Sequence, residues 1–174
     1  MMLEIADIVT PIGKLRLAAR RGSLCALDFA EHWPRDRARL EKRFGRVEFC
    51  RSRDPGRIVG RLRAYFAGDL RALGGVRVDP GGTPFQRRVW RALRRVAPGR
   101  TVSYRDLARA IGAPAAARAV GAANGANPIG IVIPCHRAIA ADGTLGGYAW
   151  GIERKRWLLR HESSPRRARG GHPH

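Results

Sequence analysis

Short apolar runs separated by turn residues occupy the first thirty positions of the chain. The runs cover residues 3–9, 14–19 and 24–29, and glycine-containing segments at residues 11–13 and 21–23 lie between them. Short runs joined by tight turns are typical of strands that pair with their neighbours along the chain. The pattern therefore predicts an antiparallel three-stranded meander.

Two helical stretches follow, and then a segment rich in glycine. The second stretch lies behind Asp54 and Pro55, which suit a cap and a first helical turn. Its apolar residues recur at helical spacing: Ile58, Leu62, Tyr65 and Phe66. Residues 68–82 have the composition of a linker. We therefore expect a scaffold domain in residues 1–78 and a second domain in residues 79–162.

The second domain is expected to begin with a helix and to continue with a helix-turn-helix. Thr83 suits an N-cap and Pro84 the first helical position. One apolar stripe follows: Phe85, Val89, Trp90, Leu93 and Val96. Ser103 is expected to cap a short helix, and a second helix runs from residue 115 towards residue 125 after a turn at residues 112–114. Such a pair is the helix-turn-helix pattern, although many helical hairpins bind no DNA.

The second of these short helices consists almost entirely of Ala and Gly, with Arg118 as its one bulky group. A smooth face of this kind suits tight packing against another helix inside the domain. It equally suits a close approach to a DNA groove, with Arg118 projecting. The residues alone leave both readings open.

A buried apolar strand is predicted at residues 129–133, and it leads into Cys135 and His136. A cysteine there is a candidate nucleophile, because attack requires the thiolate and a free thiol has a pKa of about 8.5, so a neighbouring base must activate it. Contact between Cys135 and His136 would need a turn or a bridging water, and the alternative is a structural core cysteine. A final amphipathic helix is expected to end near Glu162, and residues 163–174 are expected to form a basic disordered tail.

Charge adds a partner to this picture. The chain has 174 residues, with 34 Lys and Arg against 14 Asp and Glu, and a net charge of +20. The excess favours a polyanion, either nucleic acid or an anionic membrane surface, although 31 of the 34 are Arg, which codon bias also produces. No apolar run approaches a spanning helix, no secretory signal is visible, and the three cysteines lack CxxC spacing. We therefore expect a reduced, cytoplasmic protein with no membrane partner.

Residues 80–162 resemble one family throughout. The matching segments are Gly81-Gly82-Thr83-Pro84-Phe85-Gln86, Ser103-Tyr104, Ala117-Arg118-Ala119-Val120-Gly121, Asn124-Gly125, Asn127-Pro128, Pro134-Cys135-His136-Arg137, Gly146-Gly147-Tyr148, Arg154-Lys155 and Trp157-Leu158-Leu159-Arg160-His161-Glu162. In this order and spacing they are similar to the O6-alkylguanine-DNA alkyltransferases, also called methylated-DNA–protein-cysteine methyltransferases. The first 70 residues agree weakly, mainly through residues 10–13 and 65–68.

The resemblance implies an α/β (α+β) fold. It has an N-terminal RNase-H-like antiparallel sheet with helices, and a C-terminal winged helix-turn-helix-like domain that carries the cysteine. It also implies repair without a cofactor by a monomer that needs no protein partner. The helix-turn-helix docks in the minor groove of duplex DNA, and O6-alkylguanine, with O4-alkylthymine as a further candidate, is flipped into a pocket. The alkyl group then moves irreversibly to Cys135, so each molecule reacts once.

The same resemblance implies a role for each site residue. Cys135 attacks, His136 acts on it through water as a base, and Glu162 orients His136. Asn127 braces the turn before the active-site strand, and Tyr104 helps rotate the nucleotide and assists the leaving base. Positions that touch DNA in the family are Gln86, Tyr104, Arg105, Ala113, Arg118 and Ala141, with Arg118 filling the place of the extruded base. The alkylguanine pocket corresponds to Ala138, Tyr148, Ala149 and Trp150.

Two pocket positions depart from the common family pattern. Ala138 replaces a usual Val, and Trp150 stands where many relatives have Gly. A large ring there narrows the pocket, which puts tolerance for bulky alkyl groups such as benzyl in doubt. Some relatives hold zinc in the first domain, but Cys25, His32 and Cys50 have no convincing spacing for it, so we expect no metal. Two other functions fit parts of the sequence: a helix-turn-helix transcription regulator and a Cys-His hydrolase.

Overall fold

The computed structural model describes residues 1–164, which include a four-stranded sheet with the order β3-β2-β1-β4. Strands β1 (Met2–Thr10), β2 (Gly13–Arg20) and β3 (Ser23–Phe29) form the predicted antiparallel meander, which is confirmed. Strand β4 (Glu48–Arg51) pairs with β1 in parallel, so the sheet is mixed rather than purely antiparallel. This strand has only four residues and lies at the sheet edge, which explains why no clear pattern marks it in the sequence.

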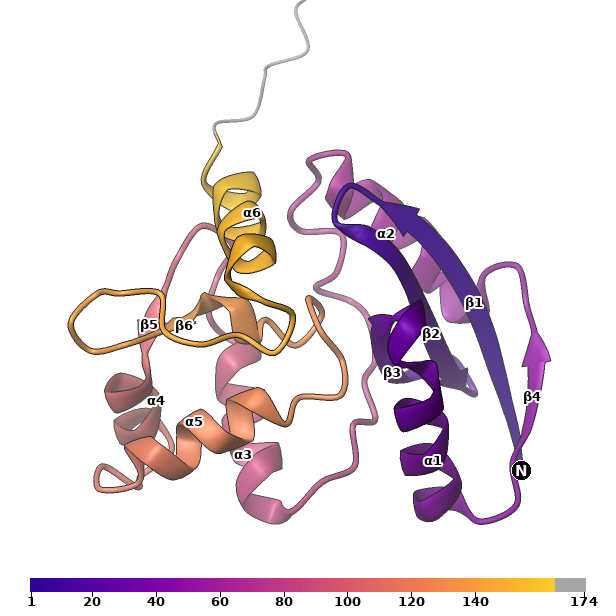
Figure 1. Cartoon of the computed structure of the whole chain (residues 1–174), viewed down its shortest axis with the longest axis horizontal. Coiled ribbons are helices and arrows are strands. Elements are labelled where there is room, and N and C mark those ends of the chain that lie inside the picture. The colour runs from indigo at the N-terminus through magenta and orange to yellow at the C-terminus, as the bar shows by residue number, and fades with distance from the viewer. Residues whose placement is uncertain (165–174) are drawn as a thin grey trace, which may run out of the picture.

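Helices cover both faces of the sheet (Figure 1). Helix α1 (Trp33–Phe44), which follows the short turn η1 (Ala30–His32), packs on one face through Leu40 against Leu3 and Ile5. Helix α2 (Ile58–Phe66) packs on the other face in a larger core that continues into the C-terminal half. The N-terminal half is therefore a three-layer unit, with one face of its sheet turned towards the rest of the molecule.

The start of α2 differs from the sequence prediction. The helix begins at Ile58, after the short turn η2 (Pro55–Arg57), because Gly56 and Arg57 have φ of 60° and 61°. Asp54 nevertheless caps it from a distance: the carboxylate accepts from the N–H of Val59 at 2.7 Å and of Gly60 at 3.2 Å. The predicted cap is thus present, but Pro55 does not occupy the first turn of the helix.

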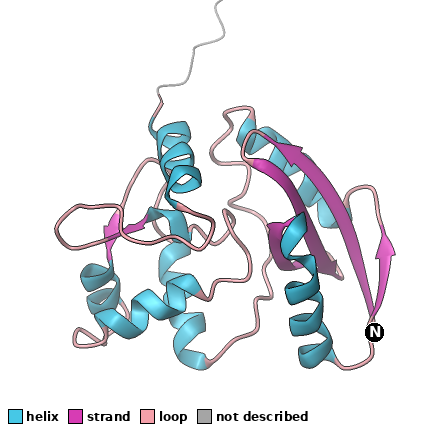
Figure 2. Cartoon of the chain, in the orientation of Figure 1, coloured by secondary structure: helices cyan, strands magenta, loops and turns pink. Residues whose placement is uncertain are grey.

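The C-terminal half is mainly helical (Figure 2). Its elements are α3 (Pro84–Arg94), β5 (Val102–Ser103), α4 (Tyr104–Ala110), α5 (Ala117–Gly125), the turn η3 (Cys135–Arg137), β6 (Ala138–Ile139) and α6 (Ile152–Ser163). Thr83 and Gln86 form a reciprocal capping box at α3, and the Ser103 hydroxyl accepts from the N–H of Asp106 at 3.0 Å. Both predicted N-caps are confirmed, as is the pair of short helices, although the second begins at Ala117.

The predicted strand at residues 129–133 is wrong. These residues are buried, but they form a compact series of turns in which Ile131 has a φ of 67° and the N–H of Val132 donates to the carbonyl of Gly130 at 2.7 Å. Among residues 1–164, their one β-bridge to the sheet joins Leu27 and Ile129. A short apolar run shows burial without showing which backbone conformation produces it, and this one is buried between the two halves.

Backbone contacts join the two halves at β3, an edge strand of the sheet. The N–H of Leu27 donates to the carbonyl of Pro128 at 3.0 Å, and the N–H of Gly130 donates back to Leu27 at the same distance. The expected linker consists of turns and a bridge from Val78 to β3, and it buries Leu73 and Val76 in the shared core. The division at residue 78 and the tail remain predictions, and residues 165–174 lie outside the described part of the chain. Within residues 1–164 no helix is long and apolar enough to cross a bilayer.

Candidate active site

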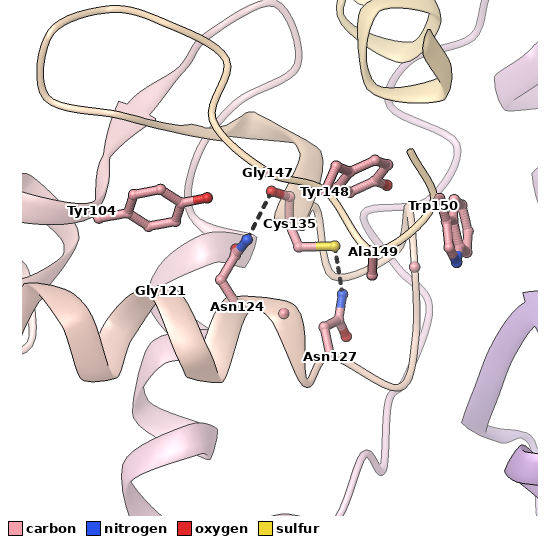
Figure 3. Close-up of a pocket in the computed structure, with 11 residues that line it drawn as sticks. Tyr104, Gly121, Asn124, Asn127, Cys135, Gly147, Tyr148, Ala149 and Trp150 are labelled. Carbon is pink, nitrogen blue, oxygen red and sulfur yellow. Dashed lines mark hydrogen bonds between the residues drawn. The ribbon is translucent and has the colours of Figure 1, made fainter. Parts of the chain in front are cut away.

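A cavity of about 170 Å³ opens beside Cys135. Figure 3 shows Tyr104 and Trp150 at opposite ends of the labelled residues, with Cys135 between them. The lining comes from α4, from α5, from the turn that follows it and from the loop before α6: Tyr104, Gly121, Asn124, Gly125, Asn127, Gly130, Cys135, Gly147, Tyr148, Ala149 and Trp150. Three of the four predicted pocket residues are in this lining. Ala138 is not; it is fully buried.

Two asparagines near the end of α5 hold Cys135 in place. The amide of Asn127 donates to Cys135 Sγ at 3.1 Å and to the carbonyl of Ile133 at 2.8 Å, while its oxygen accepts from the N–H of Ile129 at 2.9 Å. Asn124, whose functional role the sequence did not indicate, donates to the carbonyl of Cys135 at 3.3 Å. The turns after α5 therefore close on themselves and present the sulfur at the cavity (Figure 3).

Cys135 is 7% exposed, and the surroundings of its thiol oppose ionisation. Burial raises the pKa of this thiol, and the amide of Asn127, the hydroxyl of Tyr148 and the charge of Lys155 offset only part of that effect. The resting group is therefore the neutral thiol. A base must take its proton when it reacts.

His136 and Glu162 form a buried pair behind the cysteine. Residues 135–137 make a turn, as the sequence required for a contact between the two side chains, but no hydrogen bond joins His136 Nδ1 to the Cys135 thiol. His136 Nε2 lies 2.8 Å from Glu162 Oε1, and both side chains are fully buried. Because the carboxylate can only accept, the proton sits on Nε2 and Nδ1 carries a lone pair. Nδ1 is buried with no partner among the described residues, which leaves it free to accept a proton.

Glu162 accepts five hydrogen bonds from four residues. Besides His136, the donors are Arg137 Nε at 2.9 Å, Arg137 Nη2 at 2.7 Å, the Tyr65 hydroxyl at 2.8 Å and the N–H of Gly99 at 3.4 Å. Burial alone would raise the pKa of Glu162, but the hydrogen bonds from His136 and Arg137 hold it well below its usual value. Burial in turn lowers the pKa of His136, with Glu162 opposing the change. The pair at rest is a carboxylate with a neutral imidazole.

Tyr65 brings the N-terminal half into this site. It lies on α2, and its sequence pattern predicts a core residue, which it is: the ring is fully buried. The pattern gives no sign that its hydroxyl reaches Glu162 across 97 positions of sequence. Burial is the largest cause that raises the pKa of Tyr65, so the hydroxyl stays protonated and serves as a donor.

Lys155 holds the loop that carries Tyr148, Ala149 and Trp150. Its ammonium group is buried and donates to the carbonyls of Ala138 and Leu145, each at 2.6 Å, and to that of Gly147 at 3.4 Å. This loop has no regular secondary structure, so the lysine supplies the fixed contacts that strand pairing would otherwise give. The carbonyl of Ala138, one of the predicted pocket positions, is thus occupied by Lys155.

The predicted DNA contacts lie mainly around α4 and α5. Arg105, Arg118 and Ala141 are exposed, Ala113 is half-buried in the turn between the helices, and Gln86 is occupied by the cap of α3. Of the residues of α5, Val120 and Ala123 pack inside the domain, whereas Gly121 and Gly125 line the cavity. The close approach of α5 to a DNA groove stays a prediction.

No group of three potential metal ligands occurs among residues 1–164. Cys25 and Cys50 are free thiols in the N-terminal half. Burial, the largest cause, raises the pKa of the Cys25 thiol to about 11, so it remains protonated at neutral pH. The sulfur of Cys25 contacts the carbonyl of Ser23 at 3.6 Å and that of Cys50 the carbonyl of Leu3 at 3.7 Å, whereas Cys135 Sγ accepts from the amide of Asn127.

Comparisons with known proteins agree with this geometry. Residues 84–164 match the family model described as 6-O-methylguanine DNA methyltransferase, DNA binding domain. A methylated-DNA–protein-cysteine methyltransferase of Salmonella typhimurium is 46% identical over 172 residues, which covers 92% of this chain and 97% of that protein. A similar protein of Mycobacterium bovis is 45% identical over 166 residues, with 94% of each chain covered.

Solved structures are similar over nearly the whole chain. The crystal structure of Mycobacterium tuberculosis OGT in complex with DNA has a TM-score of 0.75 and 43% identity, and it covers 94% of this chain and 93% of its own. The O6-methylguanine-DNA methyltransferase of Pyrococcus kodakaraensis strain KOD1 has a TM-score of 0.66 at 26% identity, covering 94% and 100% of the two chains. The expected fold class is therefore confirmed.

Proposed function

Since the chain belongs to the family of methylated-DNA–protein-cysteine methyltransferases, we propose that it repairs duplex DNA by moving an alkyl group from O6 of guanine to the sulfur of Cys135. The observation that carries this proposal is a single thiol at a small cavity, fixed by Asn127 and backed by the buried pair of His136 and Glu162. Flipping of an O6-alkylguanine out of the duplex brings the lesion to the thiol.

Recognition begins with the exposed residues around α4 and α5. The net charge of +20 attracts the DNA backbone, and the small residues of α5 allow its close approach to the minor groove. Arg118 projects from α5 and fills the place of the extruded base, while Tyr104 rotates the nucleotide towards the cavity that it lines. Gln86, Arg105, Ala113 and Ala141 contribute contacts to the backbone of the DNA.

Transfer then proceeds by displacement at the alkyl carbon. The proton of the Cys135 thiol passes through water to Nδ1 of His136, and Glu162 stabilises the imidazolium that forms. The sulfur forms a bond to the alkyl carbon as the bond from that carbon to O6 breaks. The electron pair stays on the guanine, which is protonated or hydrogen-bonded as it leaves, and Tyr104 supplies that contact. The thioether is stable, so one molecule repairs one lesion.

The same proposal includes a monomer that works without cofactor or protein partner in the cytoplasm, associated with DNA. O4-alkylthymine is a further candidate substrate, because its alkyl carbon is presented in the same way. These parts of the proposal involve no residues beyond those already named.

A single-turnover reaction tests the proposal. The protein is incubated with a duplex that carries one O6-methylguanine, and its peptides are weighed by mass spectrometry. We expect one methyl group on the peptide that contains Cys135, at no more than one equivalent, and none in Cys135→Ser. A protein that binds the lesion but leaves Cys135 unmodified would overturn the repair function. Full DNA-dependent activity in Cys135→Ser would instead support a regulator, and turnover of activated esters a hydrolase.

A further inference from the structure

Trp150 closes one end of the cavity and is anchored in the N-terminal half. Its indole Nε1 donates to Asp28 Oδ1 at 2.8 Å, a contact between residues 122 positions apart, and the residue is 9% exposed. Figure 3 shows the ring at the end opposite Tyr104. The wall of the cavity at this end is thus attached to strand β3 of the sheet, not only to its own loop.

The acceptor of this hydrogen bond is itself held firmly. Asp28 lies in β3 and is 7% exposed, and its carboxylate also accepts from the N–H of Phe29 at 2.6 Å and contacts His32 Nδ1 at 2.9 Å. The guanidinium of Arg35 donates to the second oxygen. A carboxylate with this many donors cannot rotate freely, so the indole binds a fixed point.

The indole ring has little room on its other sides. Its centroid lies 4.7 Å from that of Phe29 in an edge arrangement. On the cavity side, a Cβ placed on Gly130 would come within 2.3 Å of the ring, so the ring lies directly against the backbone of the turn that precedes Cys135. The position of the Trp150 ring therefore fixes how far the cavity extends, and its volume of about 170 Å³ is small for a ligand site.

We propose that Asp28 is a specificity-determining positioning residue, which holds Trp150 as the end wall of the alkylguanine pocket and thereby limits the size of the alkyl group accepted. The inference rests on the proposed function. Without Asp28 the indole N–H would be buried without an acceptor, and the ring would turn towards solvent to regain one. That movement lengthens the cavity beside Cys135, and a larger alkyl group then enters.

The test compares two substrates in one variant. Second-order rate constants for transfer to Cys135 are measured with duplexes of identical sequence that contain O6-methylguanine or O6-benzylguanine. We expect Asp28→Ala to raise the benzyl-to-methyl ratio by about tenfold, the size expected when one hydrogen bond to a charged acceptor is lost. Trp150→Gly should raise the ratio at least as much. In the Trp150→Gly background, Asp28→Ala should add nothing, because Asp28 acts only through Trp150.

Asp7→Ala is the matched control. Asp7 is also a carboxylate of the sheet, paired with Arg16 at 2.6 Å, but unlike Asp28 it forms no hydrogen bond to any described residue that lines the cavity. Asp7→Ala should lower the free energy of unfolding without changing the benzyl-to-methyl ratio. An unchanged ratio in Asp28→Ala, an equal rise in Asp7→Ala, or an additive effect with Trp150→Gly would each overturn the inference.

Two arrangements keep the test decisive. Should Asp28→Ala fail to fold, Asp28→Asn replaces it, because it weakens the acceptor at constant shape. This variant is expected to raise the benzyl-to-methyl ratio about threefold, since a charge-assisted hydrogen bond is roughly twice as strong as a neutral one. No rise in Asp28→Asn would overturn the inference. The wild-type reaction with O6-methylguanine separates the two proposals. If it fails, the proposed function fails, whereas normal methyl transfer with an unchanged ratio in the variants removes only the role of Asp28.

Discussion

The two halves of the chain contribute differently to one site. The C-terminal half supplies the thiol, the imidazole and the whole cavity lining, whereas the N-terminal half supplies two fixed contacts: the Tyr65 hydroxyl on Glu162 and the Asp28 carboxylate on Trp150. One contact reaches the proton relay and the other the end of the pocket. The N-terminal half therefore does more than carry the reactive half, because it constrains the residues that react and the space in which they do so.

A second difference concerns how each half treats a buried carboxylate. Glu162 accepts five hydrogen bonds, and its pKa is held well below the usual value despite burial. Asp36, on α1, is equally buried at its side chain, but its Oδ1 has no hydrogen-bond partner among the described residues, and burial, the largest cause, raises its pKa to about 6. Glu162 is therefore a charged group with hydrogen-bond donors, whereas the charge of Asp36 lowers the free energy of unfolding. Mutations at the two positions should therefore act in opposite directions.

The largest effect is expected for Glu162→Ala, because it leaves the buried cation of Arg137 without its partner. The free energy of unfolding should fall by about 3–5 kcal/mol, measured by urea titration at pH 7.5. Glu153→Ala, an exposed acid on the same helix, is the control and should change stability by less than about 0.5 kcal/mol. Equal losses in the two variants would show that Glu162 has no special structural role.

The lowered pKa of Glu162 also predicts how the stability of the protein depends on pH. An acid whose folded pKa lies below its unfolded value of about 4.3 stabilises the fold above that pH and loses this contribution as the pH falls through the folded value. The wild type should therefore lose stability below about pH 4.3 more steeply than Glu162→Ala. Parallel curves for the two proteins would contradict the assignment.

Arg118→Ala should produce the next largest effect, and it should change only the rate of transfer from duplex DNA. Loss of the side chain that replaces the extruded base is expected to slow transfer from a duplex lesion by roughly 10- to 100-fold, within the few kcal/mol that unstacking a base costs. Transfer from free O6-methylguanine base should be unchanged in the same variant. A parallel loss with both substrates would assign Arg118 to the structure of α5.

Tyr65→Phe tests the contact from the N-terminal half to the relay. Loss of one donor to a charged acceptor should lower the free energy of unfolding by about 1.5 kcal/mol. It should also make Glu162 a better partner for imidazolium, so the acidic limb of the pH profile for transfer moves to higher pH. Phe66→Leu, next to it on α2, alters packing only and should leave the profile in place. An unmoved profile in Tyr65→Phe would reduce Tyr65 to a packing residue.

The difference between the halves also explains what the sequence could predict. Caps at Thr83 and Ser103 and the three strands of the meander depend on neighbours in the chain, and each is present. The segment at residues 129–133 failed as a strand because burial does not specify conformation. Contacts such as Tyr65 to Glu162 depend on which surfaces meet after folding, and an apolar stripe on α2 gives the same pattern whatever acceptor its hydroxyl finds.

The smallest predicted effect is a gain in stability from Asp36→Asn. Between the unfolded pKa of about 3.9 and the folded value of about 6, the folded state binds a proton that the unfolded state has released, so stability falls as pH rises through this window. Above pH 6 the wild type carries the full cost of a buried charge. The gain should be about 0.5–1 kcal/mol at pH 7.5, after discounting for the partly exposed Arg39 nearby and for the favourable position of an acid in the first turn of α1.

Thermal or urea unfolding at several pH values distinguishes this effect from a general one. The advantage of Asp36→Asn should shrink as the pH falls from 6 towards 4, because the wild-type carboxyl then becomes neutral in both states. Glu41→Gln, which removes an exposed acid from the same helix, should show no such window. A gain that persists unchanged at pH 4, or a loss at pH 7.5, would mean that Arg39 satisfies Asp36 better than its unpaired oxygen implies. The two buried carboxylates would then be alike, and the contrast between the halves would rest on Tyr65 and Asp28 alone.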